Sequence, residues 1–306
     1  MAREDRNINL MQLKEMVSSI KVEEPHVGNF KVGDKNSKIL LEPGGVLRVL
    51  TDIVLKNVLE IDIGKIFLNL LCYQTRVLCP IKYSLHNDLH RIQLRGEFPA
   101  GDKKGLYEGY LTLRDGCQHA LELANALLQD HVSTPRYKYR SVRKARSETE
   151  STKKLIESEL KGSYEFLEQN GKWIISMNTK DYFQKISIFI NETTRLISIR
   201  TTLVKVSWSD QLSTFAITLF LLNSVARLDF IRAILSKNND SEKLYLVGLE
   251  SVIPLRYLEF FKIKNAIESI IVGFSFTRLP CEALLDPTVA KEYLKRIWGL
   301  TREETY

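Results

Sequence analysis

The sequence lacks the features that most directly indicate a chemical function. Its 306 residues include only 4 cysteines, and none of them shows the C-x-x-C spacing of common metal and redox sites. It contains no G-x-S-x-G, no Walker loop and no G-x-G-x-x-G. His86 and His90 flank a turn that holds Asp88, but no third ligand follows at a regular spacing. We therefore expect reduced thiols, no enzyme activity, no cofactor and no metal site.

Long apolar runs are also missing. No run approaches the ~20 residues that a helix needs to cross a bilayer. The first residues, MAREDRNINLMQ, mix acids with bases and contain no apolar signal segment. Apolar residues make up 44% of the chain and charged residues 26%, as in ordinary globular proteins. The sequence predicts a cytoplasmic chain with no membrane span, and its length favours two domains.

The net charge of +7 is concentrated in one segment. Residues 133–154 contain 8 basic and 2 acidic residues, whereas residues 1–132 contain 17 of each. The stretch VSTPRYKYRSVRKARSETES has one proline and few aliphatic residues, which is typical of a linker. Its cations, with Tyr137 and Tyr139 between them, form a candidate anion-binding site: Arg136, Lys138, Arg140, Arg143, Lys144 and Arg146. Nucleic acid, an anionic lipid surface, an acidic protein segment and plain solvation all remain open for this linker.

Two stretches about 150 residues apart share one pattern. They are FLNLLCYQTRVLCPIKYSLHNDLHRIQLRGEFP at 67–99 and FLLNSVARLDFIRAILSKNNDSEKLYLVGLESVIP at 220–254. Each contains an apolar stretch ending in Asn, then two short strands split by an Asn-Asp turn, then Pro. Apolar spacing predicts that the Asn residues, Asn69 and Asn223, lie where a helix ends. This repetition indicates an internal duplication.

Helical and alternating apolar periods give the same order of elements, α-βββ-α-ββ-α, in both halves. Helices are expected at 8–19, 62–77, 104–131, 151–169, 209–227 and 256–274, with a further helix at 286–300. The apolar stripe of the last helix, Val289, Tyr293, Ile297 and Trp298, should dock on the rest of the protein. The fold class is therefore α+β, with tandem domains at 1–132 and 153–306, a basic linker at 133–152, and antiparallel sheets packed against helices.

This order of elements resembles the fold of type III secretion chaperones and of the YbjN family. The residues that carry the resemblance are Leu222-Asn223 with Pro254, and Leu68-Asn69 with Pro99. The chain departs from these proteins because it is a tandem and is basic, whereas they are typically acidic single-domain homodimers. The resemblance implies binding of a peptide or protein partner and implies no chemistry.

The two predicted hairpins differ in their faces. In the first, one face is apolar and the other carries Lys82, Arg91, Arg95 and Glu97, so we expect that polar face to meet water. In the second, both faces are apolar and need a cover, which could be the other half, the C-terminal helix or an outside partner. The candidate partner-binding residues of this hairpin are Phe230, Ile234, Tyr245, Val247 and Leu249.

Two functions follow from these features. The first is a non-enzymatic protein- or peptide-binding module, chaperone-like or regulatory. The alternative is a nucleic-acid-associated protein that binds through the basic linker and the first sheet. Because a short linker gives about millimolar effective concentration, we expect a monomer whose halves pair as a pseudo-dimer.

Overall fold

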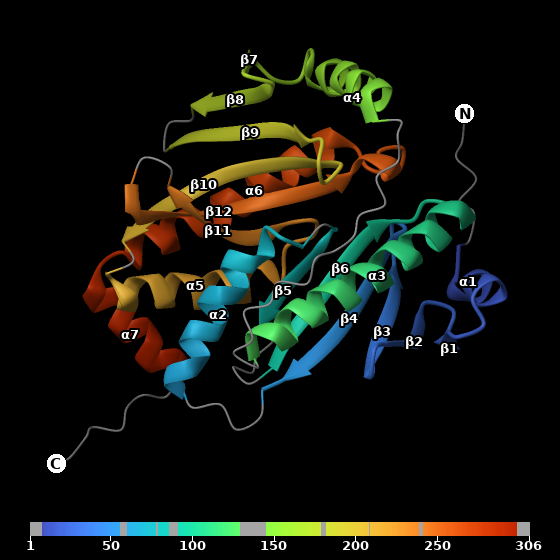
Figure 1. Ribbon diagram of the computed structural model, residues 1–306, viewed down its shortest axis with the longest axis horizontal. Helices are drawn as coiled ribbons and strands as arrows, with labels where there is room; N and C mark the ends of the chain where they lie inside the picture. The colour runs from blue at the N-terminus through green and yellow to red at the C-terminus, as the bar shows by residue number, and fades with distance from the viewer. Residues whose placement is uncertain are drawn as a thin grey trace.

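The computed structural model describes residues 8–55, 60–77, 79–85, 91–128, 145–178, 182–207, 209–238 and 241–298. These residues form two antiparallel six-stranded sheets, each packed with helices (Figure 1). The prediction of an α+β fold with two similar tandem units is confirmed. We call residues 8–128 the first half and residues 145–298 the second half.

The first half contains the first sheet, in the strand order β1-β2-β3-β4-β6-β5. Its strands are β1 (Lys21–Glu24), β2 (Val27–Val32), β3 (Lys35–Glu42), β4 (Val46–Val54), β5 (Ile81–Leu85) and β6 (Arg91–Pro99). Its helices are α1 (Leu10–Met16), α2 (Glu60–Gln74) and α3 (Lys103–Leu128). Buried residues alternate along β2, β3 and β4, as expected when one face covers a core.

The second half repeats this topology, in the strand order β11-β12-β10-β9-β8-β7. The strands are β7 (Phe166–Gln169), β8 (Lys172–Asn178), β9 (Phe183–Asn191), β10 (Leu196–Ser207), β11 (Arg232–Asn238) and β12 (Ser241–Pro254). The helices are α4 (Ala145–Leu160), α5 (Gln211–Val225), α6 (Ile263–Ala283) and α7 (Pro287–Trp298), with a short 3-10 turn at Leu255–Tyr257. When the first sheet is read from β1 and the second from β7, both have the same order of strands, and neighbouring strands are antiparallel in both.

Each half has one more strand before its middle helix than the sequence pattern predicted. The extra strands are β1 and β7, which have only 4 residues each and little buried surface. The helix expected over 151–169 begins earlier, at Ala145, and ends at Leu160, and Gly162 follows with a φ of 77°. A positive φ suits glycine and breaks the helix there. Of the apolar residues beyond it that fitted a helical period, Leu167 belongs instead to the edge strand β7, and Tyr164 lies before that strand.

The two sheets are covered on opposite sides. In Figure 1, α3 lies in front of the first sheet, and α6 lies behind the second. Each long helix approaches its sheet closely at a glycine: a Cβ on Gly116 would lie 2.9 Å from Ile81, and one on Gly273 would lie 2.8 Å from Ile231. We call β5–β6 and β11–β12 the inner hairpins. Ile81 begins the first of them and Ile231 directly precedes the second, so Gly116 and Gly273 occupy equivalent positions in the two halves.

The middle helices and the last helix also differ in detail from the sequence pattern. Neither α2 nor α5 ends at its Asn, because α2 continues to Gln74 and α5 to Val225. The last helix docks as expected on α5, with the ring of Tyr293 6.4 Å from that of Phe220. However, the buried residues of α7 are Ala290 and Leu294, while Val289 and Ile297 are 40% and 42% exposed.

A glycine in β12 tests the packing of the second sheet. A methyl group on Gly248 would collide with the carbonyl oxygen of Thr201 on β10, a backbone atom that cannot move aside alone. We expect Gly248→Ala to lower the free energy of unfolding by on the order of 1–3 kcal/mol in denaturant titrations. Gly101→Ala is the matched control, since nothing lies within 4 Å of its added Cβ. Equal stability of the two variants would contradict this account of the sheet.

Candidate functional site at the junction of the halves

The middle helix of each half packs against the other half at the junction between them. Helix α2 of the first half packs against β11 of the second, and α5 of the second half packs against β5 of the first. The two helices also meet each other at Gly64, where an added Cβ would lie 3.1 Å from the Phe215 ring. Each half therefore covers part of the other, and the arrangement relates the halves by an approximate two-fold axis.

Buried charges from the first sheet lie at this junction. Lys82 on β5 is 3% exposed and Glu97 on β6 is 2% exposed. The Lys82 Nζ atom lies 3.2 Å from Glu97 Oε1 and also donates a hydrogen bond to the Leu228 carbonyl oxygen in the second half. The backbone N–H of Phe230, in the second half, donates to Glu97 Oε2. Both charges of this pair therefore have a partner in the other half.

Two arginines surround the same carboxylate and extend the contact. Arg95 Nε lies 2.5 Å from Glu97 Oε1, and Arg95 also donates to the Ala226 carbonyl oxygen. Arg95 and Arg48 both donate to Asp229 Oδ1, over 2.7 and 2.8 Å. The loop at 226–230 is thus held by three cations of the first sheet.

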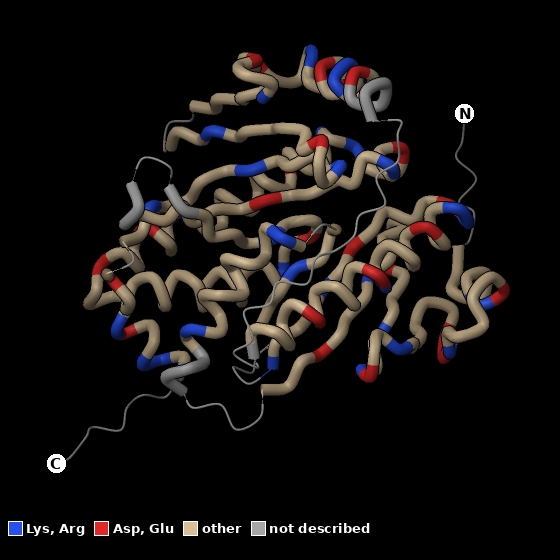
Figure 2. The backbone as a smooth tube through the Cα atoms, in the orientation of Figure 1, with Lys and Arg blue, Asp and Glu red and all other residues tan. Residues whose placement is uncertain are grey.

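A second cluster of charges lies on the second sheet. Arg232 on β11 and Glu250 on β12 are 3% and 1% exposed, with Arg232 Nη2 2.6 Å from Glu250 Oε2. Arg200 Nε lies 2.5 Å from the other oxygen, and Ser198 donates to it as well. Arg232 Nη1 also donates across the junction to the carbonyl oxygen of Val77, over 2.7 Å. Figure 2 shows that basic and acidic residues lie together at the centre of the molecule.

Lys82 and Arg232 occupy equivalent positions in the two halves. Lys82 pairs with Arg95 across the first hairpin, and Arg232 pairs with Glu250 across the second. Each cation donates to a backbone carbonyl that lies shortly before the inner hairpin of the other half. The same contact is therefore made twice, once in each direction, as an isologous interface requires.

A small cavity lies between the two clusters. Its volume is about 10 Å³, and Lys82, Glu97, Arg232 and Glu250 contribute to its lining. A cavity of this size holds about one water molecule. The charged groups around it are hydrogen-bonded to one another and to backbone carbonyls, so the arrangement acts as a clamp between the halves.

The charges raise and lower each other's proton affinity. Burial lowers the pKa of Lys82 to about 8, although the Glu97 carboxylate acts to raise it. Burial acts to raise the pKa of Glu97, but Lys82 and Arg95 outweigh it and the pKa is lowered. Glu250 behaves in the same way, because Arg232 and Arg200 lower its pKa against the effect of burial.

The prediction that the polar face of the first hairpin meets water is therefore wrong. Lys82 and Glu97 are buried, and Arg95 is bonded to the second half, so these residues do not face water. Only Arg91 of this group is exposed, with Asp52 3.7 Å away. Alternation along the strand gave the correct face, but it could not reveal that a second domain covers that face.

The candidate partner-binding residues are mostly covered from within the chain. Ile234, Val247 and Leu249 are 4%, 2% and 0% exposed. Leu249 lies against α6 at Gly273, and α2 packs on β11. Tyr245 is half-buried, and Phe230 has a φ of 58° with its ring 6.2 Å from that of Phe261. The two-sided apolar pattern is thus explained by covers on both faces, which was one of the alternatives that the sequence left open.

Other predicted sites fall outside what the structure describes. Arg136, Lys138, Arg140, Arg143 and Lys144 lie outside the described residues, as does the side chain of Arg146 in α4. His86 and His90 do as well. Within the described ranges, no group of three or more metal-binding side chains occurs. No helix in those ranges has the length and apolar character needed to cross a membrane.

One surface was not predicted from the sequence. The outer face of the second sheet carries Leu167 and Phe183, which are 63% and 61% exposed. Cross-strand pairing places Leu167 beside Ile174, then Ser187, then Arg200, so this face runs into the charge cluster of the junction. The exposed alternation along β8 and β9 could have suggested it, but β7 itself was assigned to a helix.

Comparison with known proteins gives no family for the chain. No protein-family model matches it, and no curated protein matches it significantly.

Acid should weaken the junction through its carboxylates. Because the pKa of Glu250 is lower in the folded than in the unfolded protein, its contribution to stability is present above its unfolded pKa and is lost as the pH falls through the folded pKa. At neutral pH, we expect Glu250→Gln to cost on the order of 3 kcal/mol, since Arg232 loses its charged partner. The difference from the native protein should shrink below about pH 4 in denaturant titrations. The exposed Glu24→Gln is the control, and an equal effect there would contradict this role.

The buried lysine should respond at the other end of the pH scale. Lys82 loses its proton at about pH 8 when folded, but only near its ordinary value of 10.5 when unfolded. Between these values the unfolded state binds more protons, so stability rises with pH. The native protein should therefore gain stability relative to Lys82→Met between about pH 8 and pH 10.5. Thermal unfolding of both proteins across this range measures the difference, and a constant difference would mean that Lys82 does not titrate there.

Proposed function

We propose that this chain is a non-enzymatic binding module, chaperone-like or regulatory, that holds a protein or peptide partner on the open face of its second sheet. The supporting observation is the exposure of Leu167 and Phe183 on that face. Ile174 and Phe189, on the same face, are half-buried. Large apolar side chains gathered on an exposed sheet face are a common feature of partner-binding sites.

The edge of the sheet supports the same proposal. Strand β7 lies at the end of the strand order, and among the described residues it pairs only with β8. An extended segment could add to such an edge through backbone hydrogen bonds, while its side chains contact the neighbouring face. Lys172 and Arg200 lie over the Phe189 ring, at 5.7 and 4.9 Å from its centroid. Cations that flank an apolar face favour a partner with apolar and acidic side chains.

The junction gives this surface a fixed support. Because the row from Leu167 ends at Arg200 and Glu250, the binding face is anchored to the buried clamp between the halves. In this proposal, the tandem supplies the pairing that the resembled single-domain chaperones obtain by forming homodimers. The nucleic-acid alternative can no longer use Lys82 and Arg95 of the first sheet for phosphate contacts, since both are bonded within the chain. It then depends on the linker alone.

Partner capture tests the proposal. Leu167→Asp combined with Phe183→Asp should remove the bound partners that the native chain retains from a cell extract at high salt, as identified by mass spectrometry. Val54→Asp is the matched control, because Val54 is 51% exposed on the outer face of the first sheet. In addition, a captured partner should slow hydrogen exchange in β7 and β8. If the captured partners dissociate as the salt concentration rises, or still bind after the double substitution, the proposal is contradicted. Such a result would favour the nucleic-acid alternative, with phosphate contacts at the linker.

A further inference from the structure

The two charge clusters at the junction differ in their balance of charge. The first cluster pairs three cations with three carboxylates, and its members are Lys82, Arg48, Arg95, Glu97, Asp229 and Glu42. In the second cluster, as far as the chain is described, Arg232 and Arg200 share the single carboxylate of Glu250. Arg232 is 3% exposed, whereas the side chain of Arg200 is 33% exposed. The second cluster therefore carries one surplus positive charge, which reaches the surface at Arg200.

The guanidinium group of Arg200 is fixed on one side and free on the other. Its Nε atom donates to Glu250 Oε1 and to Ser198 Oγ, over 2.5 and 2.9 Å. Its Cζ atom lies 4.9 Å from the centroid of the Phe189 ring, on the open face of the second sheet. Within the described part of the chain, no group accepts a hydrogen bond from its Nη1 or Nη2 atom. Two parallel donors are thus held at the surface, which is the arrangement that binds a carboxylate through both of its oxygens.

The surroundings of this guanidinium are basic and apolar. Lys172, which pairs with Phe189 across the strands, places its Nζ atom 5.7 Å from the centroid of the same ring. Strands β7–β10 contain a single acidic residue, Glu168, which pairs with the buried Trp173 and so lies on the other face. Glu250, on the next strand, is 1% exposed and is held by the two arginines. Among the described residues of this face, a negative group on a partner therefore meets two cations and no exposed carboxylate.

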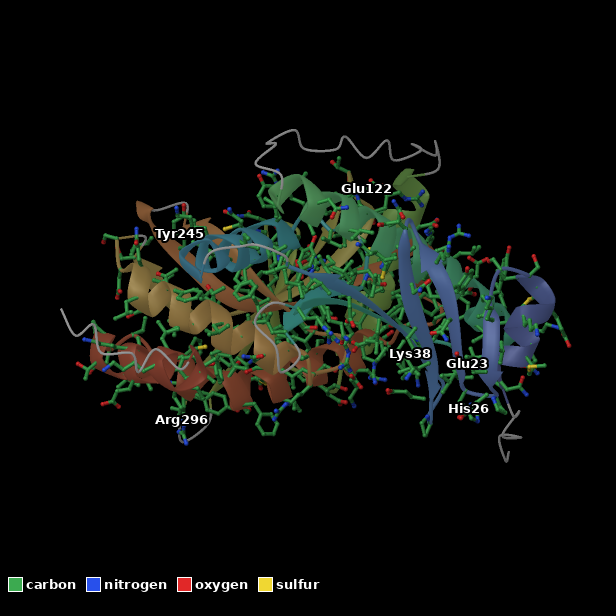
Figure 3. All side chains as sticks on the ribbon, turned by 90° about the horizontal axis from the view of Figure 1, so that it is seen from below. Glu23, His26, Lys38, Glu122, Tyr245 and Arg296 are labelled. Carbon is green, nitrogen blue, oxygen red and sulfur yellow. The ribbon has the colours of Figure 1, made fainter. Side chains whose placement is uncertain are left out.

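The first half shows that the fold does not require an arginine at this position. Leu50 of β4 pairs with Arg95, as Arg200 of β10 pairs with Glu250, so Leu50 and Arg200 are equivalent. The surroundings of Leu50 also differ, because its neighbour on β3 is the exposed Lys38 (Figure 3). The anchored arginine is therefore a feature of the second half and not of the shared topology.

We infer that Arg200, with Lys172 beside it, is a carboxylate-binding subsite of the open face, which binds one acidic side chain of the protein or peptide partner. The inference rests on the proposed function, since it assigns a chemistry to the same face. The Nη1 and Nη2 atoms of Arg200 donate to the two carboxylate oxygens, and Lys172 adds a second positive charge. The Phe189 ring and the Glu250 carboxylate hold the guanidinium in place before the partner binds, so little conformational entropy is lost.

The position of the subsite limits which part of the partner carries the acidic residue. Arg200 lies three strands in from the edge strand β7, in the row through Ser187, Ile174 and Leu167. With strands about 4.8 Å apart, this row spans about 14 Å. A strand added beside β7 would lie farther away still, so the acidic residue belongs to a part of the partner that lies across the face. Apolar residues of the partner then contact Ile174 and Leu167, nearer the edge.

Selection of peptides from a random phage-displayed library on the full chain tests the inference. The native chain should enrich peptides that combine apolar residues with an Asp or Glu. Arg200→Gln should still enrich apolar peptides without a preference for the acid, and should bind the peptides selected on the native chain about 10-fold more weakly. Lys185→Gln is the matched control, because it removes an exposed cation from the same face and leaves Arg200 in place. Acidic peptides that bind Arg200→Gln as tightly as the native chain would overturn the inference.

The outcomes separate this inference from the proposed function. If the native chain enriches apolar peptides without an acid, and Leu167→Asp with Phe183→Asp abolishes their binding, the face binds peptides but the carboxylate subsite is wrong. If no selected peptide depends on Leu167 and Phe183, the proposed function and the subsite are both wrong. A fluorescent single-stranded DNA that binds the native chain and is lost from Arg200→Gln would assign phosphate to this position and overturn the carboxylate.

Chemical modification reports on the guanidinium directly. Phenylglyoxal reacts with the Nη atoms of accessible arginines, and a selected acidic peptide should protect Arg200 from it. Arg296, exposed on α7 (Figure 3), is the internal reference and should react equally with and without peptide. The same peptide with its acid changed to the amide should not protect Arg200, and equal protection by both peptides would contradict a carboxylate contact. Arg200→Gln should fold, because Arg232 still pairs with Glu250, and circular dichroism checks this.

Discussion

The arrangement of the whole molecule depends on two buried cations that reach across the junction. The side chains of Lys82 and Arg232 extend from their own sheets, and each donates a hydrogen bond to a backbone carbonyl of the other half. A buried charge without partners is costly, so each contact must form with the halves in one relative position. Apolar burial by α2 and α5 supplies area but little direction. The ion clusters therefore fix how the two sheets are placed relative to each other.

The two halves carry different residues at equivalent positions, as two units joined in one chain can. Arg95 of the first half corresponds to Glu250 of the second, since each pairs with the inner cation of its own hairpin. In a homodimer these positions would carry the same charge. In the tandem they carry opposite charges, and only one half supplies the Glu97 carboxylate that binds the Phe230 N–H. The junction is thus two-fold in shape but specific for the unlike half.

The divergence extends to the surfaces that remain open. The first half turns charged residues to solvent on α3, while the second turns apolar residues to solvent on α6 and on the outer face of β7–β9. Because both halves keep the same topology, these differences cannot be attributed to folding alone. Both halves contribute charges to the clamp, whereas the exposed apolar residues of α6 and of the outer face of β7–β9 belong to the second half.

The sequence by itself determined the elements that have a clear period and a clear end. Alternation located β8–β10 and both hairpins, and apolar spacing located α5. The helix expected at 256–274 was placed only in part, because α6 begins at Ile263, after a 3-10 turn at Leu255–Tyr257, and continues to Ala283. It also revealed the duplication, because paired landmarks such as Pro99 and Pro254 recur after similar elements. It missed β1 and β7, whose 4 residues are too few to establish a period. Tertiary structure decided the rest. Lys82 and Glu97 sit on the polar face of a hairpin, and a pattern of alternation distinguishes two faces without saying what lies against each. The sequence led us to expect that Lys82 and Glu97 contact water, but in the structure they contact backbone groups of the other half.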